Sequence, residues 1–97
     1  MSKKIFDTKL FTPVTGKDKY LLLMNQLAHE NIQISYINYL NEEILEASLS
    51  SGVKVIFSLD KDIISEVTSL QLILSRFRIE GRKINRIDLR FKNAVVE

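Results

Sequence analysis

The chain has 97 residues, of which 45% are hydrophobic and 27% charged, with a single Pro and three Gly. A chain of this length buries roughly two thirds of its unfolded surface, which is enough for one core, so we predict one compact soluble domain. It contains no cysteine, which excludes disulfides and thiolate zinc sites. It also has no apolar run near the roughly 20 residues that a membrane-spanning helix needs.

The net charge of +2 is unevenly distributed, because Lys and Arg concentrate at both ends of the chain and acidic residues in its middle. Such basic clusters attract nucleic acid, anionic lipid or an acidic protein segment, and they also occur on ordinary solvated surfaces. The charge alone does not choose between these interpretations.

The N-terminal part is predicted to contain a flexible segment, residues 1–9, and a short extended lead-in, Leu10–Gly16, in which Pro13 disfavours a central strand. A helix is predicted from Lys17 to Glu30, where Asn31 offers a stop. Its apolar positions recur at three and four residues: Tyr20, Leu23, Met24, Leu27 and Ala28.

Three strands follow, over Ile32–Leu40, Ile44–Leu49 and Val53–Ser58. In the second connection, the apolar faces match only if Leu49 pairs with Val53. The loop between them is then Ser50-Ser51-Gly52, in which Gly52 supplies the left-handed residue that such loops need.

The register of the first hairpin, around Asn41-Glu42-Glu43, stays open. A two-residue turn points the even-numbered residues from Ile34 to Leu40 into the core, whereas a three-residue turn points the odd-numbered residues from Ser35 to Tyr39 inward.

A second helix is predicted to begin at Asp60 or Asp62, acting as N-cap, and to end at Gly81. One apolar stripe runs along it: Ile63, Val67, Leu70, Leu74 and Phe77. Leu72 and Ile79 lie off this stripe, which predicts a second, partly buried contact for the helix.

The C-terminal segment alternates as a strand should. Ile87, Leu89 and Phe91 are predicted to face the core, and Arg86, Asp88 and Arg90 the solvent. Lys92-Asn93 is the next candidate turn, and Ala94–Val96 forms a short final strand. A strand at the end of a chain often has one neighbour only, and its unpaired edge can accept another chain.

Together these elements predict an α+β fold: a mostly antiparallel mixed β-sheet with two α-helices packed on one face. The expected order is a short extended lead-in, a helix, three strands, a helix and two strands, which make a single domain over residues 10–97.

The whole pattern from Leu10 to Val96 resembles the extracytoplasmic β domain of the FtsQ/DivIB bacterial cell-division family. The resemblance rests on the Gly-terminated lead-in and helix, on the hairpin strand Gly52–Phe57, on the apolar helix ending in Gly, and above all on Ile87-Asp88-Leu89-Arg90-Phe91. Family members normally carry one membrane-spanning helix and a POTRA domain before this β domain. The chain is then expected to be a soluble fragment that inserts in no membrane itself.

The resemblance implies a non-catalytic divisome scaffold that recruits FtsB/DivIC-like and FtsL-like coiled-coil partners at the division septum, on the extracytoplasmic face of the cell membrane. In the family, the partner docks on the last strands of the β domain, partly by strand addition. Carried onto this chain, the partner-binding residues are Arg90, Phe91, Lys92, Asn93, Ala94, Val95 and Val96. The resemblance also implies that the family's aromatic at position 91 is partly offered to the partner, which a bulge over Phe91–Asn93 would allow.

Other interpretations exist for these residues. Arg90 has Asp88 as an alternative partner, and Ala94–Val96 is also consistent with a plain closing edge strand. A small basic nucleic-acid-binding module is the rival function, with phosphate contacts from Arg76, Arg78, Arg82, Lys83, Arg86, Arg90 and Lys92. Nucleic-acid binding would weaken steeply with salt, whereas strand docking should fail when Val95 becomes Pro.

We expect no catalytic residue, cofactor or metal. His29, the only histidine, is interpreted as a residue near a helix C-terminus, and Asp60-Lys61-Asp62 as a helix cap, because it lacks the Gly and the distal Glu of a calcium loop. No nucleophile or carboxylate pair is apparent.

Overall fold

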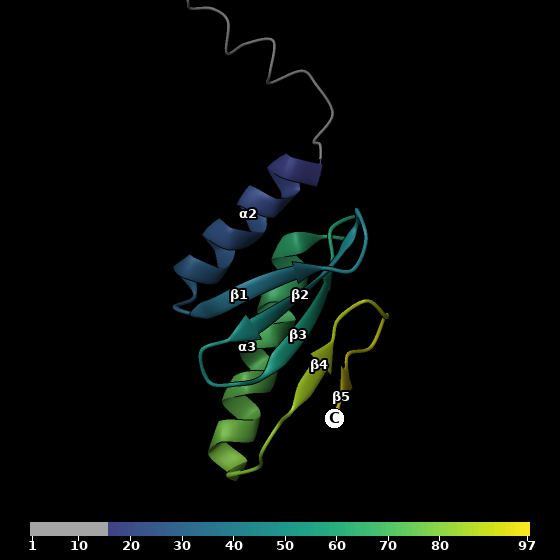
Figure 1. The fold of residues 1–97 in the computed structure, drawn as a ribbon. Coiled ribbons are helices and arrows are strands. Elements are labelled where there is room, and N and C mark those ends of the chain that lie inside the picture. The colour runs from purple at the N-terminus through teal and green to yellow at the C-terminus, as the bar shows by residue number, and fades with distance from the viewer. Residues whose placement is uncertain (1–15) are drawn as a thin grey trace, which may run out of the picture.

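The computed structural model describes residues 16–97, so the predicted flexible segment 1–9 and the lead-in up to residue 15 lie outside the described residues. The elements are helix α2 (Gly16–His29), strands β1 (Ile34–Tyr39), β2 (Ile44–Leu49) and β3 (Lys54–Ser58), helix α3 (Ile63–Glu80), and strands β4 (Arg86–Asp88) and β5 (Val95–Val96) (Figure 1). The predicted α+β fold and its order of elements are confirmed.

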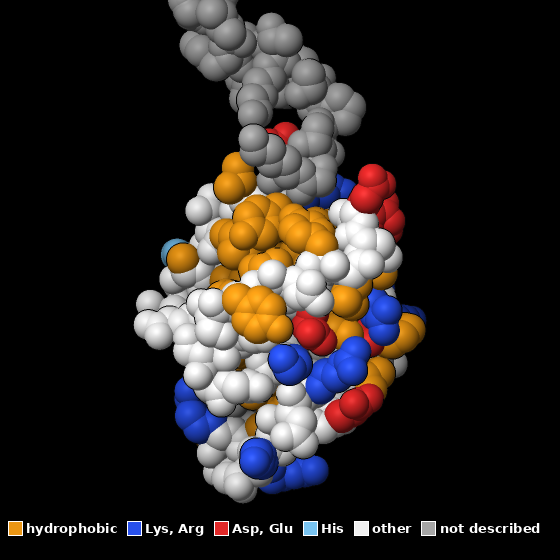
Figure 2. Space-filling view, viewed as in Figure 1, with side chains coloured by type: hydrophobic (Ala, Val, Ile, Leu, Met, Phe, Trp, Pro, Cys, Tyr) orange, Lys and Arg blue, Asp and Glu red, His pale blue; other side chains and the backbone are white. Residues whose placement is uncertain are grey.

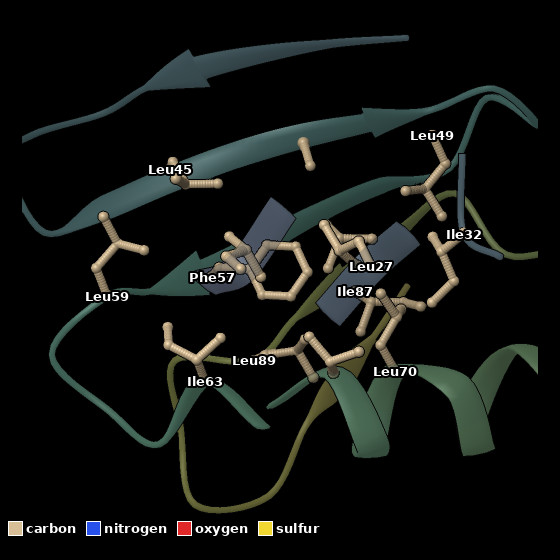
Figure 3. Close-up of a cluster of buried hydrophobic side chains, with 14 of the residues drawn as sticks. Leu27, Ile32, Leu45, Leu49, Phe57, Leu59, Ile63, Leu70, Ile87 and Leu89 are labelled. Carbon is tan, nitrogen blue, oxygen red and sulfur yellow. The ribbon is translucent and has the colours of Figure 1, made fainter. Parts of the chain in front are cut away.

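The five strands form one sheet in the order β1-β2-β3-β4-β5. All neighbours are antiparallel except β3 and β4, which run parallel and are connected through α3. Buried side chains from both helices and from the inward faces of β2, β3 and β4 form one cluster, with Phe57 among its largest members (Figure 3). The strands at the two ends of the order, β1 and β5, therefore form the edges of the sheet.

Both helices end at left-handed residues, as the sequence predicts. Asn31 has φ 60° after α2, and Gly81 has φ 68° after α3, where its N–H donates to the Arg78 carbonyl. At the start of α3 the N-cap is Asp62, whose carboxylate accepts the N–H groups of Ile64 and Ser65. The choice between Asp60 and Asp62 is thus settled.

The helical stripes are placed as predicted, with one exception. Leu23 and Leu27 of α2 are buried, but Ala28 is exposed. On α3 the stripe from Ile63 to Phe77 is buried or half-buried. Leu72 and Ile79 remain 66% and 82% exposed, so the predicted second contact does not cover them within residues 16–97.

The loop between β2 and β3 has the predicted register. The N–H of Leu49 donates to the carbonyl of Val53 at 2.8 Å, and Gly52 has φ 100°. The three-residue loop and the left-handed glycine are confirmed.

The first hairpin uses the three-residue turn. The Asn41 side chain accepts the N–H groups of Glu43 and Ile44 at 2.8 and 2.9 Å, which closes the turn without a glycine. Tyr39 pairs with Leu45 and faces the helices, and a bulge between Ile34 and Tyr36 then turns Ile34 inward as well. The residues of β1 that face the core therefore come from both alternatives that the sequence left open: Tyr39 belongs to the odd-numbered set and Ile34 to the even-numbered set.

The prediction that Phe91 faces the core is wrong. Leu89 is buried, but the regular strand β4 ends at Asp88, and Phe91 is 55% exposed. The cause is local, because the Asp88 carboxylate accepts the N–H of Arg90 at 3.0 Å. This N–H is then no longer available for a hydrogen bond to a neighbouring strand. Residues 90–93 consequently form a loop instead of a strand.

Candidate partner-binding edge

Strand β5 has β4 as its only neighbour among residues 16–97. Arg86 and Glu97 exchange two backbone hydrogen bonds, at 3.2 and 2.8 Å. In an antiparallel ladder, hydrogen-bonded pairs alternate with non-hydrogen-bonded ones, so Asp88 and Val95 form the next bonded pair. The N–H and C=O of Val96 therefore point away from β4, where an incoming strand could bond to them.

This register corrects one sequence-based expectation. The N–H of Val95 is directed at β4, so Val95→Pro would break the pairing of β5 with its own sheet. The donor offered to another chain belongs to Val96, and a test of strand addition has to change that residue.

The side chains of β5 divide between the two faces of the sheet. Val96 lies opposite the buried Ile87 and packs, half-buried, on the core. Val95 lies opposite Asp88 on the other face and is 42% exposed. Ala94 also packs against the core, whereas Asn93 is exposed. The edge is thus anchored from one face and accessible from the other.

Arg90 is engaged inside the domain. Its Nε lies 2.9 Å from Asp88 Oδ1 and its Nη2 lies 2.6 Å from Asp88 Oδ2, a bidentate pair, and its guanidinium also lies over the Phe91 ring at 5.4 Å. The hydrogen bonds from Arg90 hold the pKa of Asp88 below its ordinary value, and the pairing raises the pKa of Arg90. The alternative that Arg90 pairs with Asp88 is what the structure contains.

Lys92 and Phe91 are the loop residues that remain accessible. Lys92 is exposed and makes no ion pair or hydrogen bond with any described residue. The loop itself is tied to the start of α3, because the Lys61 ammonium donates a hydrogen bond to the Arg90 carbonyl. The predicted cationic pair Arg90 and Lys92 is therefore reduced to a single available charge, that of Lys92.

A pocket of about 220 Å³ lies between α3 and this loop. Leu89, Phe91 and Ala94 give it an apolar wall, and Ser65 and Ser69 of α3 line the opposite side. Of the predicted site residues, Phe91, Lys92 and Ala94 line this hollow, whereas Arg90, Asn93, Val95 and Val96 do not.

Glu66, which sequence reasoning did not single out, also lines this pocket. It is 6% exposed, its Oε1 accepts the N–H of Ser58 at 2.8 Å, and its Oε2 has no hydrogen-bond partner among the described residues. Burial raises its pKa to about 7. The signal was present in the sequence, since position 66 lies between Ile63 and Val67 on the buried stripe.

The basic residues proposed for nucleic acid do not form one open surface. Arg76 and Arg82 each lie within 3.7 Å of Glu80, and Arg90 is paired with Asp88. Three of the seven cations thus already have acidic partners, which reduces the positive field available to phosphates.

No protein-family model matches this chain, and no curated protein matches it closely enough in sequence to count as a relative. None of the helices within residues 16–97 is long and apolar enough to cross a bilayer. Across the same residues, no group of three or more His, Asp or Glu side chains is placed to hold a metal ion.

Proposed function

We propose that this domain is a non-catalytic scaffold that binds a coiled-coil partner of the FtsB/DivIC and FtsL type by strand addition at β5. The observation that carries the proposal is the edge of β5, where the N–H and C=O of Val96 point outward and bond to no other residue of the described part, 16–97. The parent protein would then act on the extracytoplasmic face of the membrane at the division septum, as the FtsQ/DivIB resemblance implies.

The surroundings of the edge suggest what the partner segment contains. An extended segment on Val96 would pass Lys92 and the exposed ring of Phe91, and it would approach the pocket beside the loop. A strand with an acidic side chain for Lys92 and an apolar side chain for Phe91 fits this surface. A charge at the rim mainly accelerates association, whereas the backbone bonds and apolar contacts set the lifetime of the complex.

The test uses a synthetic peptide that spans the C-terminal segment of the FtsB/DivIC-like protein from the same genome, titrated by calorimetry. Val96→Pro removes the outward N–H and should weaken binding by about tenfold or more. Val96→Ala is the matched control, because it keeps the N–H and loses only methyl groups. Parental affinity for Val96→Pro would reject strand addition at this edge.

A second variant tests the charge. Lys92→Glu reverses an exposed cation that has no partner in the described residues, so the fold should be unchanged. We expect slower association with the acidic peptide and a weaker dependence on salt, with dissociation altered little. An unchanged association rate would remove Lys92 from the site.

The same titrations separate the rival function. A single-stranded oligonucleotide that binds and is released by moderate salt, irrespective of its sequence, would favour the nucleic-acid module. Binding of the peptide that persists in moderate salt and is lost in Val96→Pro would favour the scaffold.

A further inference from the structure

Among residues 16–97, the opposite edge of the sheet, β1, is also unpaired along its outer side. Its neighbour in the sheet order is β2 alone. The N–H of Leu40 donates to the Ile44 carbonyl at 2.8 Å, so Leu40 and Ile44 form a hydrogen-bonded pair. Alternation then makes the N–H and C=O groups of Ile37 and Tyr39 point outward, and they bond to no described residue.

Of the devices with which proteins usually blunt exposed strands, this edge has only a bulge at its beginning. The run Ile32–Leu40 contains no charged residue and no Pro, and Tyr36, Tyr39 and Leu40 are each about half exposed. A bulge interrupts only its beginning, between Ile34 and Tyr36. The remainder of the strand is a regular, uncharged template for another strand.

The surface beside the edge is apolar too. Figure 2 shows hydrophobic side chains gathered over α2 and β1, whereas basic side chains lie over β3 and β4. Leu21 and Leu22 of α2 are exposed, and the neighbouring Tyr20 ring lies 6.0 Å from the ring of Tyr39. The apolar surface therefore continues from the strand onto the helix.

We propose that β1 pairs antiparallel with β1 of a second copy of this chain and joins two sheets into one across a two-fold axis. Antiparallel pairing of identical strands is self-complementary, as a two-fold contact requires. An uncharged strand meets its own copy without repulsion, whereas a strand with any charge near the axis would meet a like charge. This charge argument favours a second copy over a partner of different composition.

The outward groups select a register centred on Asn38. Ile37 then exchanges its backbone hydrogen bonds with Tyr39 of the second copy, and Tyr39 with its Ile37. Asn38 lies opposite Asn38 of the second copy in a non-hydrogen-bonded pair, with Cα atoms about 4.5 Å apart. The two amides can bond to each other, and each aliphatic side chain meets an aromatic one, which is a favourable cross-strand pair.

The contact is small, because it involves one strand of six residues and the adjacent part of α2. We therefore expect a weak dimer, below the standard interface size of about 1,600 Å². Its population should rise with protein concentration between about 1 µM and about 1 mM.

Sedimentation equilibrium of the full chain over that range tests the proposal. The average mass should move from one protomer toward two. Asn38→Asp places two carboxylates face to face at the axis and should weaken dimerisation about tenfold or more. Asn38→Lys should do the same, and an equimolar mixture of the two variants should recover the dimer, because opposite charges then meet. Asn38 is exposed but lies opposite Glu46 of β2, so urea unfolding of the dilute variants has to show that both are folded under the conditions of the sedimentation experiment.

Asn93→Asp, the same substitution beside β5, is the control and should dimerise like the parent. The proposal is overturned if the chain stays monomeric over the whole concentration range. Other residues of the chain or a different protein would then be what covers β1. A dimer that survives Asn38→Asp, or one that Asn93→Asp dissolves, also overturns it. None of these results depends on the partner peptide, so this proposal and the proposed function fail separately.

Discussion

The two edges of the sheet are built in opposite ways. β1 has six residues without a charge and stays half exposed along most of its length. β5 has two residues, lies between Lys92 and Glu97, and is anchored by Val96 on the core. Short length and flanking charge restrict a strand edge to partners that complement it, whereas an uncharged edge can meet a copy of itself without repulsion between like charges. If both proposals hold, this small sheet has a selective edge at β5 and a self-pairing edge at β1.

The largest expected effect tests how firmly each edge is anchored. Leu89→Ala, next to β4 and in the core, should lower the free energy of unfolding by about 2–5 kcal/mol. Ile37→Ala at the β1 edge should cost only about 1–2 kcal/mol, because Ile37 is partly buried. Urea unfolding of dilute protein measures both. Equal losses would contradict the difference in anchoring.

The second test concerns pH on the β5 side. The pKa of Glu66 rises from 4.5 to about 7 on folding, so the folded state holds this proton more tightly. The fold therefore loses stability as the pH rises from about 4.5 through 7. Glu66→Gln keeps an acceptor for the Ser58 N–H and should stabilise the domain by up to about 3 kcal/mol at about pH 8, with little gain at about pH 5.

Unfolding curves of the parent and of Glu66→Gln over that pH range check this expectation. A gain of the same size at both ends would show that the charge on Glu66 is not responsible. Self-association through β1 should not change over the same range, because the strand from Ile32 to Leu40 carries no acidic, basic or histidine side chain.

The smallest expected effect concerns the loop that leads into β5. The pKa of Asp88 is lowered by Arg90, so their pairing stabilises the fold above the ordinary carboxyl value of 3.8 and is lost as the pH falls below it. Asp88→Asn keeps an oxygen for the Arg90 N–H and removes the ion pair. It should cost about 1 kcal/mol at neutral pH, since solvent reaches the Arg90 side chain, and less at about pH 3.

Thermal melts at these two values measure the difference between Asp88→Asn and the parent. The same substitution should leave dimerisation through β1 intact. A loss of stability that is independent of pH would assign the effect to packing and not to charge.

The sequence predicts those parts of the fold whose signals are local. The cap at Asp62, the left-handed stop at Gly81 and the hairpin glycine Gly52 each satisfy a backbone requirement within a few residues. The inward faces of β2 and β3 followed from alternation, because only one loop length buries both. These features were recoverable because no distant contact competes with them.

The candidate site was harder to predict because side chains compete with the backbone there. Alternation places Phe91 inward, but the Asp88 carboxylate takes the N–H of Arg90 and ends the strand. The same carboxylate forms an ion pair with the Arg90 guanidinium, which the sequence analysis had assigned to the partner-binding site. Periodicity places Glu66 on the buried stripe of its helix, but it does not reveal the hydrogen bond that Glu66 accepts from Ser58 at the end of a strand.

The bulge between Ile34 and Tyr36 inserts one extra residue, Ser35, whose hydroxyl donates to the Ser48 carbonyl at 3.0 Å. It bends the first third of β1 out of the plane in which another chain would lie. Deleting Ser35 would straighten the whole strand and lengthen the uninterrupted ladder it presents. The length of ladder that β1 can share with a second copy is therefore limited by a single inserted serine.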